Sequence, residues 1–223
     1  MNIEHPAKVP IDALRANVSV SFEESRAMPP QVYTSKEFNK TELEQIFKKD
    51  WFCVGRASAL AKPGDYVTCE LAEQPVIVLR DQNNTLRAMS NVCRHRMSTL
   101  LNGSGSAKVI VCPYHAWTYN LDGSLRGAPA MKANKAFCKN QYKLPTIACE
   151  EWLGWVFINL NPDAKPVSQE LTEVKELIKG YDMTNYTQTF FEEHLWDTNW
   201  KILAENFMES YHLPVCHAGT IGG

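Results

Sequence analysis

Two short motifs, CRH at residues 93–95 and CPYH at residues 112–115, each place one thiol close to one imidazole. Sixteen residues, 96–111, separate the two motifs. The other five of the seven cysteines have no partner at a comparable ligand spacing, except that Cys216 is followed directly by His217. We therefore expect these five to be small core residues, and the two motifs to form one metal-binding site.

Mixed thiolate and imidazole ligation is typical of one kind of iron–sulfur centre. In a [2Fe–2S] cluster of this kind, two thiolates hold one iron and two imidazoles hold the other. We predict that Cys93 and Cys112 bind the first iron, and that His95 and His115 bind the second. Two alternatives stay open, a zinc site and unliganded core residues, although zinc fingers usually place a cysteine pair before a histidine pair.

The residues around these motifs form short apolar runs bounded by turn-forming residues, which predicts a β-rich stretch from about residue 51 to residue 160. Asp122-Gly123 is a typical hairpin turn. The expected strands lie at residues 66–71, 75–80, 86–92, 117–125 (as a hairpin) and 152–160.

Helical signals lie on both sides of this stretch. Residues 1–33 contain several prolines and little periodicity, which predicts an extended arm. A helix is expected to start with Thr34 as its N-cap and Glu37 three residues later. The elements expected after the strands are a helix over 171–181, a strand-like piece near Phe190, and a helix over 199–212 that Pro214 ends.

A second set of possible metal ligands, Glu209, His212 and His217, lies near the C-terminus. Glu209 and His212 are three residues apart, so on a helix they would share a face. Pro214 would end that helix and let the chain curl until His217 faces the same ion. Two imidazoles and a carboxylate can hold Fe(II) and leave positions open. On its own this spacing is weak, because paired histidines near a helix end are more often structural or surface residues.

Together the two sets resemble the Rieske non-haem iron oxygenases, the ring-hydroxylating oxygenase α subunits. The resemblance rests on the segments DWFCVG at 50–55, NVCRHR at 91–96, CPYHAWTYNLDGSL at 112–125 and NWK at 199–201, and on the pairs EN and YH that follow. It implies an α+β chain with an N-terminal arm and helix (1–40), an all-β Rieske [2Fe–2S] domain (41–160) and the beginning of an α+β, helix-grip-like catalytic domain (161–223).

The resemblance also implies roles for the C-terminal residues. His212 and His217 would be ligands of a mononuclear Fe(II). Glu209 would be the carboxylate that links His212 to the cluster ligand His115 of a neighbouring subunit. Asn206 would lie close to this iron without being a firm ligand. The third ligand, an acidic residue, is expected beyond Gly223, so we expect the chain alone to be inactive.

Two positions depart from the pattern common in the family. Met97 stands where the family commonly has Gly after the first motif, so the loop backbone is expected to differ slightly there. Glu209 stands where many dioxygenases have Asp, and a Glu at this position is familiar among oxygenases of quaternary ammonium compounds such as carnitine, choline and glycine betaine.

The implied function is that of a terminal oxygenase, as a homotrimer, which uses O₂ to hydroxylate or demethylate a small organic substrate, with quaternary amines among the candidates. The sequence contains neither a plant-type ferredoxin motif nor a nucleotide-binding fingerprint, so a separate NAD(P)H-dependent flavin/iron–sulfur reductase or a ferredoxin would supply electrons. The alternatives are an aromatic-ring cis-dihydroxylating dioxygenase, a Rieske ferredoxin-type electron carrier and a binding module built on an inactive oxygenase.

Composition agrees with an ordinary globular protein. The chain has 223 residues, 44% of them hydrophobic and 22% charged, with a net charge of −2. This charge balance argues against a generally basic protein that binds nucleic acid or an anionic membrane. The first residues lack the basic segment followed by an apolar segment that is typical of a secretory signal peptide. No apolar run approaches the roughly 18 residues of a membrane helix. We expect a cytoplasmic protein with reduced cysteines, and neither nucleic acid nor membrane as a partner.

Overall fold

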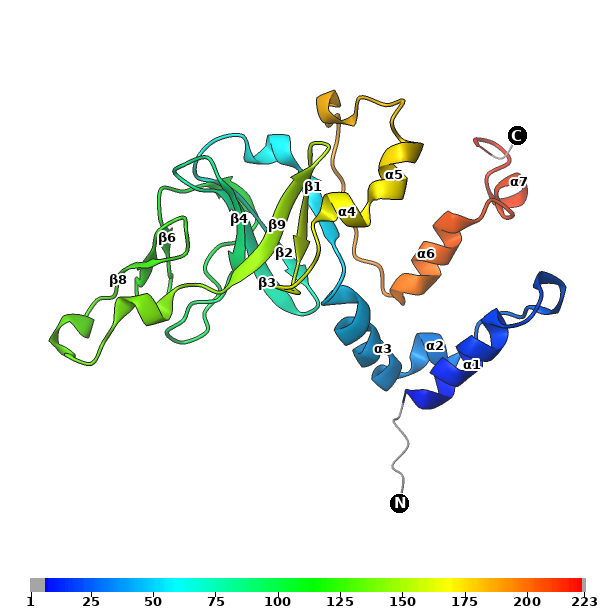
Figure 1. Cartoon of the computed structure of the whole chain (residues 1–223), viewed down its shortest axis with the longest axis horizontal. Coiled ribbons are helices and arrows are strands. Elements are labelled where there is room, and N and C mark those ends of the chain that lie inside the picture. The colour runs from blue at the N-terminus through cyan, green and yellow to red at the C-terminus, as the bar shows by residue number, and fades with distance from the viewer. Residues whose placement is uncertain (1–6, 222–223) are drawn as a thin grey trace, which may run out of the picture. The chain divides into compact units, whose positions relative to one another are not determined.

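The computed structural model of the chain describes residues 7–221 (Figure 1). These residues form two units. One unit runs from Leu43 to Thr189, and the other combines the segment up to Glu42 with the segment from Phe190 onward. The first unit contains every strand that the structure describes, and the second is helical.

The larger unit is built on a seven-stranded antiparallel sheet with the order β1-β10-β9-β4-β3-β2-β5. Strands at 66–71, 75–80 and 86–92 were expected, and the structure confirms them as β2, β3 and β4. The bounds are β1 (Phe52–Arg56), β2 (Asp65–Leu71), β3 (Gln74–Arg80), β4 (Leu86–Ser90), β5 (Ser104–Ser106), β9 (Thr146–Trp152) and β10 (Trp155–Asn159).

Strand β3 separates two hydrophobic cores. Its residues Val76, Ile77, Val78 and Leu79 are all completely buried. Successive side chains of a strand point to opposite faces of the sheet. Ile77 and Leu79 accordingly belong to the core that contains both motif cysteines, whereas Val76 and Val78 belong to the core against β10. The two Cys/His motifs therefore lie on one of the two packed faces of the sheet.

A smaller antiparallel sheet carries the second motif. It consists of β6 (Ile110–Val111), β7 (Thr118–Tyr119) and β8 (Leu125–Gly127). The predicted hairpin is confirmed: the backbone N–H of Asn120 donates to Ser124 O at 2.9 Å, and Gly123 adopts φ +82°. The CPYH motif occupies the connection between β6 and β7.

The strand expected at 152–160 is confirmed in β10, and the first residues of that range are the end of β9 and the turn that joins the two strands. The chain turns at Leu153 and Gly154, which have φ values of +50° and +78°. Two consecutive positive φ values are typical of the tight turns that suit strand twist. Trp152 and Trp155 flank this turn and pair with each other across the two strands, so the aromatic run contains the turn.

The N-terminal region is more helical than expected. Helix α1 (Lys8–Val18) occupies part of the predicted arm, because Pro10 lies in its first turn, where a missing N–H is tolerated. Residues 1–6 of that arm lie outside the described residues. The remaining elements of this region are η1 (Phe22–Glu24), α2 (Gln31–Thr34), α3 (Lys36–Glu42), the π-helix η2 (Leu43–Phe47) and η3 (Ala57–Leu60).

Thr34 is not the N-cap of the helix that follows it. It is the last residue of α2. Ser35 caps α3 instead, because its Oγ accepts a hydrogen bond from the backbone N–H of Phe38 at 3.2 Å. The predicted helix start was therefore misplaced by one residue.

The C-terminal half also differs from expectation. Helix α5 covers only the first part of the helix predicted over 171–181, α4 precedes it across a break at Leu171, and the piece near Phe190 is not a strand. No helix among the described residues is long and apolar enough to cross a membrane. The elements are η4 (Met131–Ala133), η5 (Lys139–Tyr142), α4 (Val167–Glu170), α5 (Thr172–Leu177), η6 (Met183–Asn185), α6 (Trp200–Met208) and α7 (Leu213–Cys216).

Candidate metal sites

The two motif loops have the same backbone conformation. In the first loop, the N–H of Met97 donates to Cys93 O at 3.1 Å, and in the second the N–H of Ala116 donates to Cys112 O at 3.0 Å. Met97 and Ala116 occupy the same place in the turn and have φ values of +56° and +54°. The loop at Met97 thus keeps the left-handed turn that a glycine would adopt most easily.

The loops bring together the four residues that were predicted as cluster ligands. Cys93 and Cys112 are buried, with 1% and 3% exposure. His95 and His115 are exposed, and their ring centroids lie 4.8 Å apart. The thiols therefore form an inner pair and the imidazoles an outer pair.

The surroundings adjust the acidity of these groups. Burial opposes ionisation of Cys112, but hydrogen bonds from the backbone of Tyr114 and His115 and from the side chains of Cys93 and Ser98 together outweigh it, so the pKa of this thiol is lowered. The pKa of His95 is also lowered, chiefly by desolvation and then by the nearby His115 and Arg96. A thiolate and a neutral imidazole are the forms that bind a metal.

Three aromatic residues that the sequence analysis did not single out support the ligands. The hydroxyl of Tyr119 lies 3.3 Å from Cys93 Sγ. The ring of Trp117 stacks on His95 with centroids 4.8 Å apart and an angle of 4°. The ring of Tyr114 lies against that of His115, with centroids 3.8 Å apart. Their place within or directly beyond the CPYH motif was the available signal.

The donor set fits a [2Fe–2S] cluster. Each iron of such a cluster takes two protein ligands, so two separate pairs are what it requires. A zinc site needs four donors around one point. Among residues 7–221, no group of three or more His, Cys, Asp and Glu side chains is placed to share one ion. The pairs Cys93 with Cys112 and His95 with His115 therefore favour the cluster over zinc.

The C-terminal residues meet in a turn and not along a helix, so the expectation of a shared helix face is wrong. Helix α6 ends at Met208, and Glu209 is extended with φ −122° and ψ 157°. The Glu209 carboxylate accepts hydrogen bonds from the backbone N–H groups of Tyr211 and His212. A carboxylate that bonds to nearby N–H groups competes with helical hydrogen bonding, which explains the early end of α6.

The same turn joins the carboxylate to the first histidine. Glu209 Oε1 is hydrogen-bonded to His212 Nδ1, and this contact is the main reason that the pKa of Glu209 is lowered. Pro214 lies in the first turn of α7 and does not end the preceding helix as predicted. The single turn of α7 brings His217 back toward His212, with ring centroids 5.4 Å apart. His212 thus contacts the Glu209 carboxylate and lies near His217, although the three side chains are not placed to share one ion.

Asn206 occupies the last turn of α6, and its side chain is exposed. It makes no side-chain hydrogen bond within the described part of the chain. The structure therefore leaves its side chain available, and its predicted place near the iron stays a prediction.

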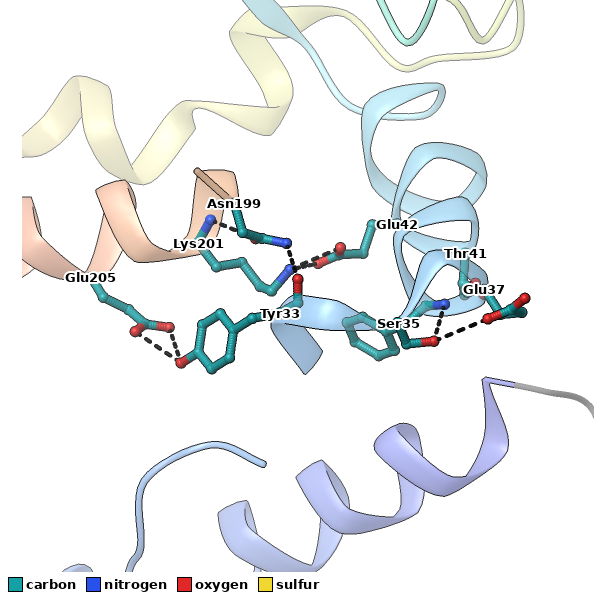
Figure 2. Close-up of polar contacts among 9 residues, drawn as sticks. Tyr33, Ser35, Glu37, Thr41, Glu42, Asn199, Lys201 and Glu205 are labelled. Atoms are coloured by element: carbon teal, nitrogen blue, oxygen red, sulfur yellow. Dashed lines mark hydrogen bonds and ion pairs between the residues drawn. The ribbon is translucent and has the colours of Figure 1, made fainter. Parts of the chain in front are cut away.

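A buried ion pair, shown in Figure 2, fixes helix α6 against the N-terminal helices. Lys201 Nζ lies 2.8 Å from Glu42 Oε1, with both side chains less than 10% exposed. Asn199 donates from Nδ2 to Tyr33 O at 3.0 Å, and the Tyr33 hydroxyl donates to Glu205 at 2.9 Å. The sequence analysis missed these partners because some 160 residues separate them. They hold the helix that leads into the turn of Glu209.

Comparison with known families defines the class of protein. Residues 50–147 match the family described as Rieske [2Fe-2S] domain, and residues 179–222 match the family described as ring hydroxylating alpha subunit (catalytic domain). The chain therefore contains a Rieske [2Fe-2S] domain and a segment that matches the catalytic domain of ring-hydroxylating α subunits.

Individual relatives narrow the comparison. The carnitine monooxygenase oxygenase subunit of Acinetobacter pittii (strain PHEA-2) is 38% identical over 194 residues, which cover 86% of this chain and 52% of that protein. The same subunit of Escherichia coli (strain K12) is 35% identical over 218 residues, which cover 92% of this chain and 56% of that protein. The chain thus spans about half the length of the curated relatives it matches.

Solved structures agree with this assignment. The quaternary ammonium Rieske monooxygenase CntA in complex with L-carnitine has a TM-score of 0.78 at 38% identity, covering 86% of this chain and 55% of that one. Naphthalene 1,2-dioxygenase from Rhodococcus sp. bound to indole has a TM-score of 0.82 at 28% identity, and the match covers 93% of this chain and 49% of that chain. The fold is therefore common to monooxygenases and dioxygenases.

Proposed function

We propose that this chain is part of the oxygenase subunit of a Rieske monooxygenase that acts on a quaternary amine. The observation that carries the proposal is the presence in one chain of the paired Cys/His loops and the turn of Glu209, His212 and His217. An electron carrier needs only the first set. The similarity to carnitine monooxygenase and to a structure bound to L-carnitine supports the substrate class.

Each residue has a defined task in this proposal. Cys93, Cys112, His95 and His115 would hold the [2Fe–2S] cluster, and His212 with His217 would hold Fe(II) together with an acidic residue. When bound, these groups supply single electrons and activate O₂ beside the substrate. Asn206 would approach the iron from the end of α6.

Glu209 would connect the two centres. Its hydrogen bond to His212 Nδ1 fixes the orientation of that ring and leaves Nε2 available to a metal. Its side chain is 44% exposed, so a further donor can reach the carboxylate. That donor would be His115 of the partner subunit. The oxygenase would therefore be an assembly of identical subunits, and we propose a homotrimer in the cytoplasm.

Electrons would come from a separate protein, an NAD(P)H-dependent flavin/iron–sulfur reductase or a ferredoxin. One of the similar structures is a quaternary ammonium Rieske monooxygenase described in connection with carnitine oxidation and inter-subunit electron transfer. Within the proposal, each subunit needs both a donor protein and a neighbour of its own kind.

Glu209→Gln in the full-length subunit tests this role. The change keeps the size but removes the charge and one acceptor, so both metals should stay bound while cluster oxidation in a single turnover slows by at least about a hundredfold. His212→Ala should lose the mononuclear iron and keep the cluster spectrum. Glu193→Gln, an exposed change in the same unit, is the control. Cluster oxidation and product formation at the parental rate in Glu209→Gln would refute the bridge.

The structural similarity to naphthalene 1,2-dioxygenase makes ring dihydroxylation the second candidate. Turnover of the full-length enzyme under ¹⁸O₂ separates the two, with L-carnitine, glycine betaine and naphthalene as substrates. A monooxygenase places one labelled atom in the organic product, and a dioxygenase places two. Two labelled atoms in a naphthalene product, with no O₂ uptake on the amines, would overturn the proposed substrate class.

A further inference from the structure

The charges of this chain are distributed very unevenly. Residues 82–149 contain nine lysines and arginines but only one acidic residue, Asp122, so this stretch has a net charge of +8. The whole chain has a net charge of −2, so the other residues together carry −10. The basic stretch is the part of the chain that contains both cluster loops.

The exposed basic residues in and near the cluster loops include Arg94 and four others that we consider together. Arg96 lies in the first loop, and Arg126 lies in β8. Lys135 and Lys139 belong to the segment that follows β8 in Figure 1. We call these four residues the basic rim.

The segment after β8 packs next to His95. Phe137 and Tyr142 contact Trp117 edge-to-face, with centroids 5.6 and 5.3 Å away. Trp117 in turn stacks on His95. Lys139 Nζ also donates to Arg126 O at 3.1 Å, which ties the segment to β8. The basic rim is therefore fixed on the His95 side of the cluster loops.

The basic rim has no acidic partner of its own. Within residues 7–221, no carboxylate lies at ion-pair distance from any of its four side chains. The cluster loops also expose two large side chains, Met97 at 70% and Tyr114 at 59%. Exposed apolar groups on the same part of a protein as uncompensated charge are typical of transient docking surfaces, where charge guides association.

We infer that the basic rim docks an acidic, single-electron-donating protein on the His95 side of the cluster. This inference rests on the proposed function. It adds the chemistry of the partner and the side from which electrons enter. The residues outside 82–149 have a net charge of −10, which would repel an extended polyanion such as nucleic acid. A compact acidic patch on a partner protein would contact only the basic rim. A second copy is the competing occupant, but the proposed bridge to a second copy uses His115.

Calorimetry and stopped-flow reduction with one probe test the inference on the full-length, iron-loaded subunit. The probe is a plant-type [2Fe–2S] ferredoxin with a strongly acidic surface. We expect its Kd to rise about tenfold in the variant Lys135→Glu/Lys139→Glu at low salt, and its cluster-reduction rate to fall equally. Both differences should disappear when salt is raised from about 20 to about 200 mM, because the Debye length shortens.

The control is Lys175→Glu/Lys179→Glu, which makes the same change of charge on α5 and in the residues after it. It should leave the Kd and the rate within about twofold. Equal losses in both variants, or no loss in either, would overturn the inference. A changed oligomeric mass of the rim variant with unchanged ferredoxin binding would also overturn it, in favour of a second copy.

Dithionite separates this test from the proposed function. As a small reductant it does not need the docking surface, so it should reduce the cluster of every variant at one rate. Failure of dithionite to reduce the parent protein would contradict the iron–sulfur assignment itself. Normal reduction by dithionite with salt-independent reduction by ferredoxin would refute only the docking inference.

Discussion

Tyr119 connects the cluster loops to the protein core. Its side chain is completely buried on β7. Its hydroxyl accepts a hydrogen bond from the backbone N–H of Arg94 at 3.0 Å and lies beside Cys93 Sγ. Burial, with the neighbouring Cys93 as the next cause, raises the pKa of Tyr119 well above its ordinary value. In the proposed cluster Cys93 is a thiolate, which can only accept a hydrogen bond, so the Tyr119 hydroxyl would donate to the sulfur.

Tyr119→Phe should lower the reduction potential of the cluster. A hydrogen bond to a ligand sulfur stabilises the reduced, more negative form, and the variant removes this bond without changing the ring. Spectroelectrochemical titration measures the shift. Tyr142→Phe, which alters a tyrosine packed on Trp117, should leave the potential unchanged. An equal potential in Tyr119→Phe and the parent would show that the hydroxyl does not act on Cys93.

At the scale of elements, the β9–β10 hairpin organises the end of the Rieske domain. Arg56 is 5% exposed and donates from Nη1 and Nη2 to four backbone carbonyls, those of residues 153, 183, 184 and 186. Its guanidinium also lies over the ring of Trp155. Because Gly154 has no Cβ, the guanidinium can lie against its backbone, and a Cβ there would be 2.7 Å from Nη2.

Gly154→Ala should therefore destabilise the domain by about 2 kcal/mol or more. The left-handed φ of +78° costs an alanine roughly 1–2 kcal/mol, and the clash with Arg56 adds to this. Urea unfolding followed by tryptophan fluorescence measures the loss. Gly180→Ala, where no atom lies within 4 Å of the new Cβ, should be neutral or slightly stabilising. Equal urea midpoints of unfolding for Gly154→Ala and Gly180→Ala would contradict this account of the turn.

Prediction from sequence succeeded where the cause is local. The Asp122-Gly123 hairpin and the strands β2 to β4 follow from turn residues and alternation within a few positions. It failed where a side chain competes with the backbone: Glu209 accepts two N–H groups and ends α6 early. The approach of His95 to His115 agrees with the prediction that the two short motifs form one site. The Lys201–Glu42 pair could not be predicted, because the two residues are far apart in the sequence.

At the scale of the whole molecule, the proposed reaction needs more than one subunit. The predicted cluster ligands belong to the unit from Leu43 to Thr189, and the Glu209 turn belongs to the other unit. The Lys201–Glu42 pair stabilises the second unit by joining segments from both ends of the chain. Proteins of this design can combine sites from neighbouring copies, which makes the assembly part of the active site.

Complementation between inactive subunits tests the central claim, that electrons pass from the cluster of one subunit to the iron of another. Full-length Cys93→Ser lacks the cluster, full-length His212→Ala lacks the mononuclear iron, and each should be inactive alone. Randomly mixed oligomers should recover about one quarter of the parental activity per site, because one interface in four joins an intact donor to an intact acceptor. Mixed oligomers that are verified by mass but stay inactive would contradict the claim.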